Sequence, residues 1–92
     1  MKYFNRHEHM SAETRRSILE AITELYSIDG EMFSLSNMLY GLFDGFDYSD
    51  QIHKSKEIFI IQEQNEALYI KLLDIIKAVK SYPKSETHNT LI

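Results

Sequence analysis

Apolar residues recur every seven positions in this chain, in two registers three residues apart, and this repeat restricts the possible folds more than any other feature. A sustained apolar heptad is typical of helices that pack against other helices. In the first half, all positions of registers a and d are apolar: Ile18, Leu25, Met32 and Leu39, and Ala21, Ile28, Leu35 and Leu42. The second half repeats the pattern with Ile58, Asn65, Leu72 and Val79, and Ile61, Leu68, Ile75 and Tyr82. The sequence therefore predicts an all-α protein.

Turn-forming residues separate the two halves. The stretch 44–50 combines acidic residues, serine and Gly45, which favour turns. Ser11 is a good N-cap, so the first helix is expected over 12 to about 43. The second is expected from about 50 to 82, where Pro83 disfavours continuation. A break at Asp29-Gly30 is the alternative for the first helix, because glycine commonly ends helices, but the unbroken heptad favours one helix.

The segment Ile58-Phe59-Ile60-Ile61 has the propensity of a short buried strand. The heptad continues beyond it and helix-forming residues follow, so we expect helix there as well. Two long helices joined by a short loop pack antiparallel as a hairpin. The predicted organisation is a flexible N-terminus over 1–10, a helical hairpin domain over 11–82 and a disordered C-terminal tail over 83–92.

Beside the two registers, further apolar residues widen the apolar face of each helix. In the first helix they form a column at heptad position b: Leu19, Tyr26, Phe33 and Tyr40. A lone hairpin cannot cover so broad a face, and large exposed apolar patches usually mark interaction surfaces. The commonest solution is a two-fold dimer that forms a four-helix bundle. The expected interface residues are Tyr26, Phe33, Tyr40, Phe59, Asn65, Tyr69 and Leu73.

Asn65 interrupts an otherwise apolar register. A buried asparagine at such a position lowers stability but can pair with its symmetry mate and select register and partner number. The alternative is that Asn65 lies at the edge of the core and its amide reaches water.

The residue inventory argues against a metal site, a cofactor or a catalytic centre. The chain has no cysteine, which removes disulfides, thiolate ligands and cysteine nucleophiles. His7 and His9 have a metal-binding spacing but no obvious companion ligand. Asp44, Asp47 and Asp50 do not follow the spacing of a calcium loop. No phosphate-binding glycine loop or catalytic motif is present, so we expect a protein without cofactor, metal or enzymatic activity.

Charge and hydropathy limit the partners and the compartment. The formal net charge of −4 disfavours nucleic acid, whose affinity for proteins comes mainly from cations. The N-terminus is too polar for a secretory signal, and the longest apolar runs are four residues, too short for a membrane span. We therefore expect a cytoplasmic protein with no membrane partner.

The expected function is that of a small non-enzymatic protein-interaction module, an accessory or regulatory protein of a bacterium or phage that acts as a homodimer. Two alternatives stay open. One is an immunity-type or inhibitor protein, a monomeric bundle that neutralises a toxin or host enzyme. The other is a small nucleic-acid-binding regulator that uses six cations on a shared face: Arg15, Arg16, Lys54, Lys56, Lys77 and Lys80.

Overall fold

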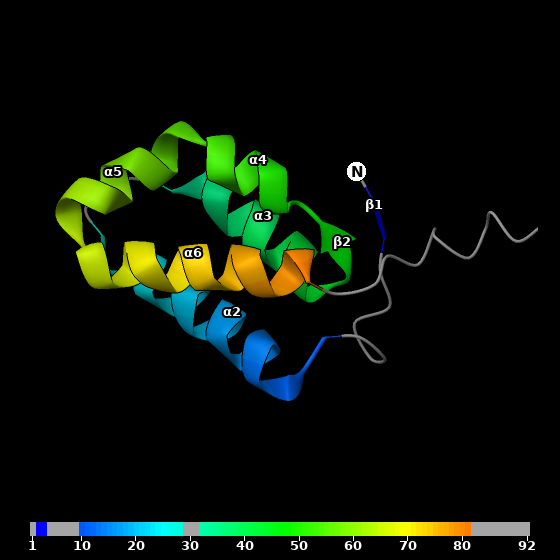
Figure 1. The fold of residues 1–92 in the computed structure, drawn as a ribbon. Helices are drawn as coiled ribbons and strands as arrows, with labels where there is room; N and C mark the ends of the chain where they lie inside the picture. Colours follow the sequence, from blue (N-terminus) through cyan, green and yellow to red (C-terminus); the bar gives the residue numbers. More distant parts are fainter. Residues whose placement is uncertain (1, 4–9, 29–31, 82–92) are drawn as a thin grey trace, which may run out of the picture.

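The computed structural model describes residues 2–3, 10–28 and 32–81, which form five helices and one two-stranded antiparallel sheet (Figure 1). The helices are α2 (Ala12–Leu25), α3 (Phe33–Phe43), α4 (Ser49–Lys54), α5 (Lys56–Gln64) and α6 (Glu66–Lys80). The strands are β1 (Lys2–Tyr3) and β2 (Phe46–Asp47). The all-α prediction is confirmed. The two long helices of a hairpin are not formed, because each half of the chain is divided into shorter helices.

The first long helix was expected to run through Gly30, and the structure corrects this. Helix α2 ends at Leu25, where the backbone N–H groups of Tyr26, Ser27 and Ile28 each bond to the carbonyl three residues earlier instead of four. The Ser27 hydroxyl also donates to the Glu24 carbonyl at 2.7 Å. These bonds satisfy the last carbonyls of the helix and end it. The alternative of two helices is correct, although Asp29 and Gly30 themselves lie outside the described residues.

The second long helix was expected from about 50 to 82, and two single-residue joints divide it. At Ser55 the backbone is extended (φ −67°, ψ 139°), and the side-chain oxygen accepts from the Glu57 N–H at 3.1 Å. At Asn65 the backbone also leaves the helical region (φ −151°, ψ 87°), and the side-chain oxygen accepts from the Leu68 N–H at 3.1 Å. Each joint residue is therefore the N-cap of the helix that follows it.

The heptad predicts the core even though the helices are broken. Of the a and d positions that the structure describes, all are buried except Ile28 and Asn65, which are partly buried. Helix is also confirmed over Ile58–Ile61, which lies within α5. The repeat therefore identifies the residues that face the core, independently of where each helix begins and ends.

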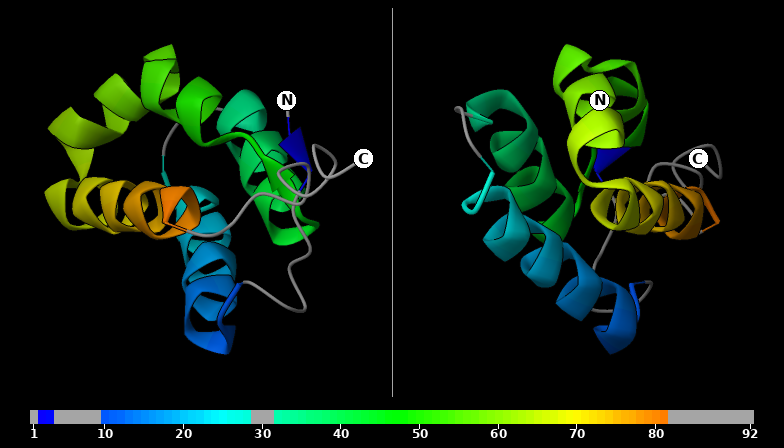
Figure 2. Two further views of the ribbon diagram at one scale, coloured as in Figure 1. Left: turned by 45° about the vertical axis from the view of Figure 1, so that its right-hand side comes forward. Right: turned by 90° about the vertical axis from the view of Figure 1, so that its left-hand side faces the viewer.

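Helix α6 is central to the packing. It packs against α2 on one side and against α4 and α5 on the other (Figure 1). Helix α3 packs beside α2, and its other neighbours are α4, α5 and β2. The two rotated views in Figure 2 show α2 and α3 adjacent to each other, with α4 and α5 arching from α3 to the start of α6. This arrangement leaves an outer surface on α2 and α3 that no other described helix covers.

The turn after α3 connects the helices to the short sheet. Gly45 adopts a positive φ of 103°, the left-handed conformation that commonly ends a helix and that glycine adopts without strain. It leads into β2, in which Phe46 pairs with Tyr3 and Asp47 with Lys2. The prediction of a flexible N-terminus over 1–10 is corrected at Lys2 and Tyr3, which pair with β2, and at Met10, which is buried. The expected tail over 83–92 lies outside the described residues.

Candidate protein-interaction surface

The b column of the sequence forms an exposed apolar surface on α2 and α3, here called the aromatic column: Leu19, Tyr26, Phe33 and Tyr40. Their exposed fractions are 44%, 72%, 67% and 44%, large values for side chains of this kind. Leu19 and Tyr26 are seven residues apart at the end of α2, and Phe33 and Tyr40 are seven apart on α3, so each pair lies on one side of its helix. The packing of α2 against α3 makes the two pairs one surface.

A polar contact joins the two halves of this column. The hydroxyl oxygens of Tyr26 and Tyr40 are 3.4 Å apart, and either can donate. The hydrogen bond with Tyr26 and the proximity of a second phenolate raise the pKa of Tyr40 above its ordinary value. The polar atoms of the two side chains are therefore close together while both rings stay exposed.

Helix α3, the outer half of this surface, contains no charged residue. Its exposed positions are Phe33, Ser34, Asn37 and Tyr40. A solvent-exposed helix face without Lys, Arg, Asp or Glu is unusual for a protein surface, whereas depletion of charge is characteristic of the core of an interface. The exposed face of α3 therefore differs from α2, which carries five charged residues.

The start of α3 depends on a carboxylate from another helix. Met32, the N-cap residue, makes no side-chain capping bond. Glu57 of α5 replaces it, because its Oε1 accepts from the Leu35 N–H at 2.7 Å. A carboxylate at a helix N-terminus satisfies a free N–H group and interacts favourably with the helix dipole. Glu57 thus fixes the position of α3, and with it the position of Phe33, relative to α5.

Apart from Asn65, the predicted interface residues fall into two groups in the structure. Tyr26, Phe33, Tyr40 and Phe59 are exposed, Phe59 to 57% on α5. Tyr69 and Leu73 are partly buried and pack against the core instead of forming a free surface. Sequence reasoning did not single out three other exposed apolar residues, Phe46, Ile60 and Ile70. Ile60 and Ile70 lie outside the a, d and b registers of the second half, and Phe46 lies in the stretch 44–50 that was predicted to be a turn.

Asn65 does not occupy the helical seam that the sequence predicts for it. It is the N-cap of α6, and its amide oxygen is bonded to the Leu68 N–H within the same chain. Pairing across a dimer axis within a continuous helix is therefore wrong for this residue. The physical reason is that asparagine competes for backbone N–H groups and so favours helix starts over helix interiors.

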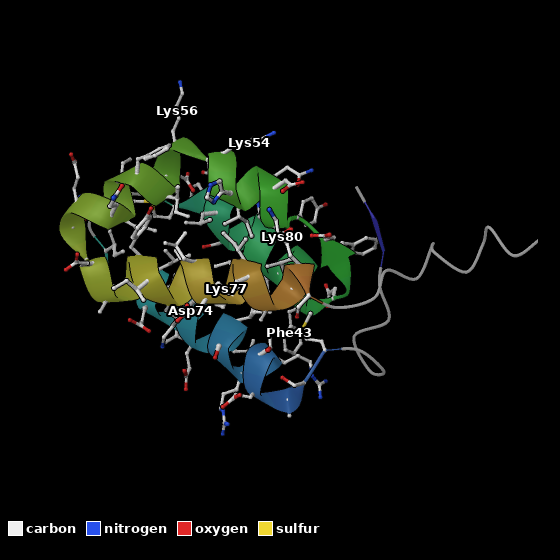
Figure 3. All side chains as sticks on the ribbon, in the orientation of Figure 1. Phe43, Lys54, Lys56, Asp74, Lys77 and Lys80 are labelled. Atoms are coloured by element: carbon white, nitrogen blue, oxygen red, sulfur yellow. The ribbon has the colours of Figure 1, made fainter. Side chains whose placement is uncertain are left out.

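The six cations of the nucleic-acid hypothesis do not form one cluster. Arg15 and Arg16 are on α2, whereas Lys54 is the last residue of α4. Helix α6 lies between these two helices. Figure 3 shows Lys54 and Lys56 on the α4 and α5 side and Lys77 and Lys80 along α6, with Asp74 on the same helix as the latter two. The positive charge is thus divided between α2 and the side formed by α4, α5 and α6.

Ion pairs compensate part of that charge. Lys80 Nζ lies 2.9 Å from the Asp50 carboxylate and lowers the pKa of Asp50, with a smaller contribution from Lys54. Lys71 on α6 reaches Glu24 at 2.9 Å and Glu20 at 3.3 Å on α2. These hydrogen bonds raise the pKa of Lys71, and the bond with Glu24 contributes most. Two acids of α2, Glu20 and Glu24, therefore help to hold α2 against α6.

A groove of about 500 Å³ runs between α2 and α6. Its floor and walls are formed by Thr14, Ser17, Ala67, Ile70 and Ile75, with Glu13, Lys71, Asp74 and Ala78. The groove is open to solvent, and its lining mixes apolar and charged side chains.

Within residues 2–3, 10–28 and 32–81, no group of three His, Cys, Asp or Glu side chains that could hold a metal ion is found. Asp47 accepts from the Ser49 N–H at 3.0 Å and so supports the start of α4, as its capping chemistry predicts. His7 and His9 lie outside the described residues. Among the described helices, none combines the length and apolar character needed to cross a bilayer.

Comparison of the chain with protein-family models, with curated proteins and with solved structures finds no match.

Proposed function

We propose that this protein is a non-enzymatic protein-interaction module that acts as a homodimer, in an accessory or regulatory role, and that buries its aromatic column against a second copy of the chain. The observation that supports the proposal most strongly is the exposure of Tyr26 and Phe33, at 72% and 67%, on a contiguous surface of two packed helices. Tyrosine and phenylalanine are enriched where proteins meet, and a few such anchors supply most of the binding energy.

The charges permit a second copy as the partner. The whole chain carries a net charge of −4, so two copies repel each other at long range. The exposed positions of α3 are neutral, and a contact through them brings no like charges together. A two-fold contact through α2 and α3 of each copy would assemble a four-helix layer with these aromatic side chains at its centre.

Sedimentation velocity over a wide concentration range tests the proposal. We expect the wild-type chain to change from monomer to dimer as concentration rises. Phe33→Ser should weaken this association by roughly tenfold or more, because truncating an interface anchor costs on the order of 2 kcal/mol and a two-fold interface contains the anchor twice. Ile70→Ser is the matched control, since Ile70 is 51% exposed on α6 and lies outside the aromatic column.

A wild-type chain that stays monomeric at the highest concentration would contradict the homodimer. The exposed column would then favour the inhibitor class, whose members use such a surface to bind a different protein. Equal weakening by Phe33→Ser and Ile70→Ser would instead show that association does not use the aromatic column.

A further inference from the structure

We propose that Tyr26 and Tyr40 form a site of oxidative modification, at which a one-electron oxidant, a peroxidase acting with hydrogen peroxide, joins the two rings into an intramolecular dityrosine. The site lies on the aromatic column but does not depend on the homodimer, because both residues belong to one copy of the chain. It follows from the contact between the two hydroxyl groups, from the exposure of the two rings and from the helices that hold them.

The two side chains come from different helices and meet at their hydroxyl groups. Tyr26 is the C-cap of α2, where its backbone N–H donates to the Thr23 carbonyl, and Tyr40 lies within α3. Helices α2 and α3 pack against each other. The two hydroxyl oxygens are 3.4 Å apart, although the residues are 14 positions apart in the sequence. The packing of the helices therefore holds two phenols in contact.

The same two rings are open to an oxidant in solution. Tyr26 and Tyr40 are 72% and 44% exposed. Tyr48 and Tyr69, by contrast, are partly buried and pack against the core. Among the tyrosines whose side chains the structure describes, Tyr26 and Tyr40 are therefore the pair that combines exposure with mutual contact.

The contact matches the geometry of the product. In dityrosine a carbon–carbon bond joins the two rings at the positions next to the hydroxyl-bearing carbons, so the two hydroxyl groups of the product lie side by side. The contact between the hydroxyl groups of Tyr26 and Tyr40 brings these ring positions near each other before any oxidation. Holding two reacting groups in such proximity favours their reaction with each other over reaction with another molecule.

The step is an oxidation that removes two hydrogen atoms from the chain. Each phenol loses one electron to the oxidant and its hydroxyl proton to solvent, which leaves two phenoxyl radicals. The radicals couple at their ring carbons, the proton on each of these carbons leaves, and each oxygen is protonated again. One molecule of hydrogen peroxide accepts the two electrons and two protons and becomes two molecules of water. The new bond links α2 covalently to α3.

Treatment of the dilute wild-type chain with a peroxidase and limiting hydrogen peroxide tests the site. We expect a product of monomer size under denaturing conditions, with dityrosine fluorescence, a mass lower by two hydrogen atoms, and Tyr26 linked to Tyr40 in its proteolytic fragments. Tyr26→Phe and Tyr40→Phe should each lower the rate of this reaction by at least roughly tenfold. Tyr69→Phe is the matched control and should leave the rate unchanged, since Tyr69 is partly buried on α6.

The stability of the product reports whether the fold already holds the rings in place. Covalent closure of a loop restricts the unfolded chain, so the cross-linked protein should unfold at a higher urea concentration than the untreated protein. Tyr40→Phe treated in the same way controls for other oxidation and should show no such shift. An unchanged or lower midpoint for the cross-linked wild-type chain would contradict the inference, because it would show that the bond strains the packing of α2 against α3.

Three other results would overturn the site: a fluorescent product of dimer size only, a link in the monomer between other tyrosines, or equal rates for Tyr40→Phe and Tyr69→Phe. The homodimer is tested separately by sedimentation. A chain that stays monomeric at every concentration therefore contradicts the proposed function, whereas the tyrosine site stands or fails by the cross-linking results.

Discussion

Glu57 should stabilise the fold more than a glutamate such as Glu66 that lies only in the first turn of its own helix, because Glu57 also caps a helix to which it does not belong. Its Oε1 accepts from the Leu35 N–H at 2.7 Å, across 22 positions of the sequence, and the N-cap residue Met32 makes no side-chain bond of its own. Replacing Glu57 with alanine leaves that N–H at the start of α3 without its carboxylate. The same change removes an acid from the first turn of α5.

The expected cost is the sum of these two effects. A hydrogen bond to a charged group contributes about 1.5–3 kcal/mol, and the half-buried position of Glu57 favours the lower part of that range. A first-turn carboxylate adds about 0.3–1 kcal/mol through the helix dipole. Glu57→Ala should therefore lower the free energy of unfolding by about 2 kcal/mol. Glu57→Gln keeps an acceptor oxygen and loses only the charge, so its cost should be about half as large.

Urea denaturation of the purified variants measures these free energies. Glu66→Ala is the matched control, since Glu66 is an exposed acid in the first turn of α6 and its removal affects only the dipole interaction. It should cost no more than about 1 kcal/mol. A Glu57→Ala variant as stable as Glu66→Ala would refute the reasoning, because it would show that the bond to Leu35 contributes nothing to stability.

Three further changes test other parts of the structure. Asn65→Ala removes the N-cap of α6 and should lower the free energy of unfolding by about 1 kcal/mol in urea, whereas no loss would contradict the cap. Gly41→Ala places a methyl group against the Tyr48 ring and should cost about 1–3 kcal/mol in the same assay, unless the ring can move away. Asp50→Asn removes a carboxylate whose pKa is lowered by Lys80. An acid whose pKa is lowered by folding stabilises the fold above its ordinary pKa, and this stabilisation is lost as pH falls through the pKa of the folded state. The variant should therefore lose less stability than wild type on acidification below about pH 4. Identical pH profiles would contradict this.

The heptad was sufficient to predict the core because burial depends on which side of the chain a residue faces. Leu35, Leu39, Leu42, Leu68 and Leu72 are fully buried, as their registers predict. The helix breaks were not predictable from the same repeat. A joint of one residue changes the direction of a helix without moving the next apolar residue out of its place in the seven-residue count.

The capping residues did carry a signal for the breaks. Ser55 and Asn65 are both good N-cap types, and each stands before a helix whose first turn contains glutamate. In the sequence these signals compete with an unbroken apolar repeat, which by itself predicts one continuous helix. Local hydrogen bonding to the Glu57 and Leu68 N–H groups decides the competition in the folded chain.

The candidate surface was predictable in part. The exposure of Tyr26, Phe33 and Tyr40 follows from their position beside the seam, on helices that have neighbours on one side only. Tyr69 and Leu73 occupy comparable positions on α6 but are partly buried, because α6 has helices on both sides. Which helix is central is a property of the tertiary arrangement, and no local pattern in the sequence reports it.

The single-residue joints at Ser55 and Asn65 also determine where this chain can change length. One inserted residue at either joint would displace the following helix relative to the core, because a connection of a single residue cannot absorb it, and the buried leucines and isoleucines of that helix would lose their packing. The turn between α3 and β2 has no such restriction, since a longer loop there leaves the phase of every helix intact. Insertions and deletions during evolution should therefore accumulate next to Asp44 and Gly45 and be rejected between α4 and α6.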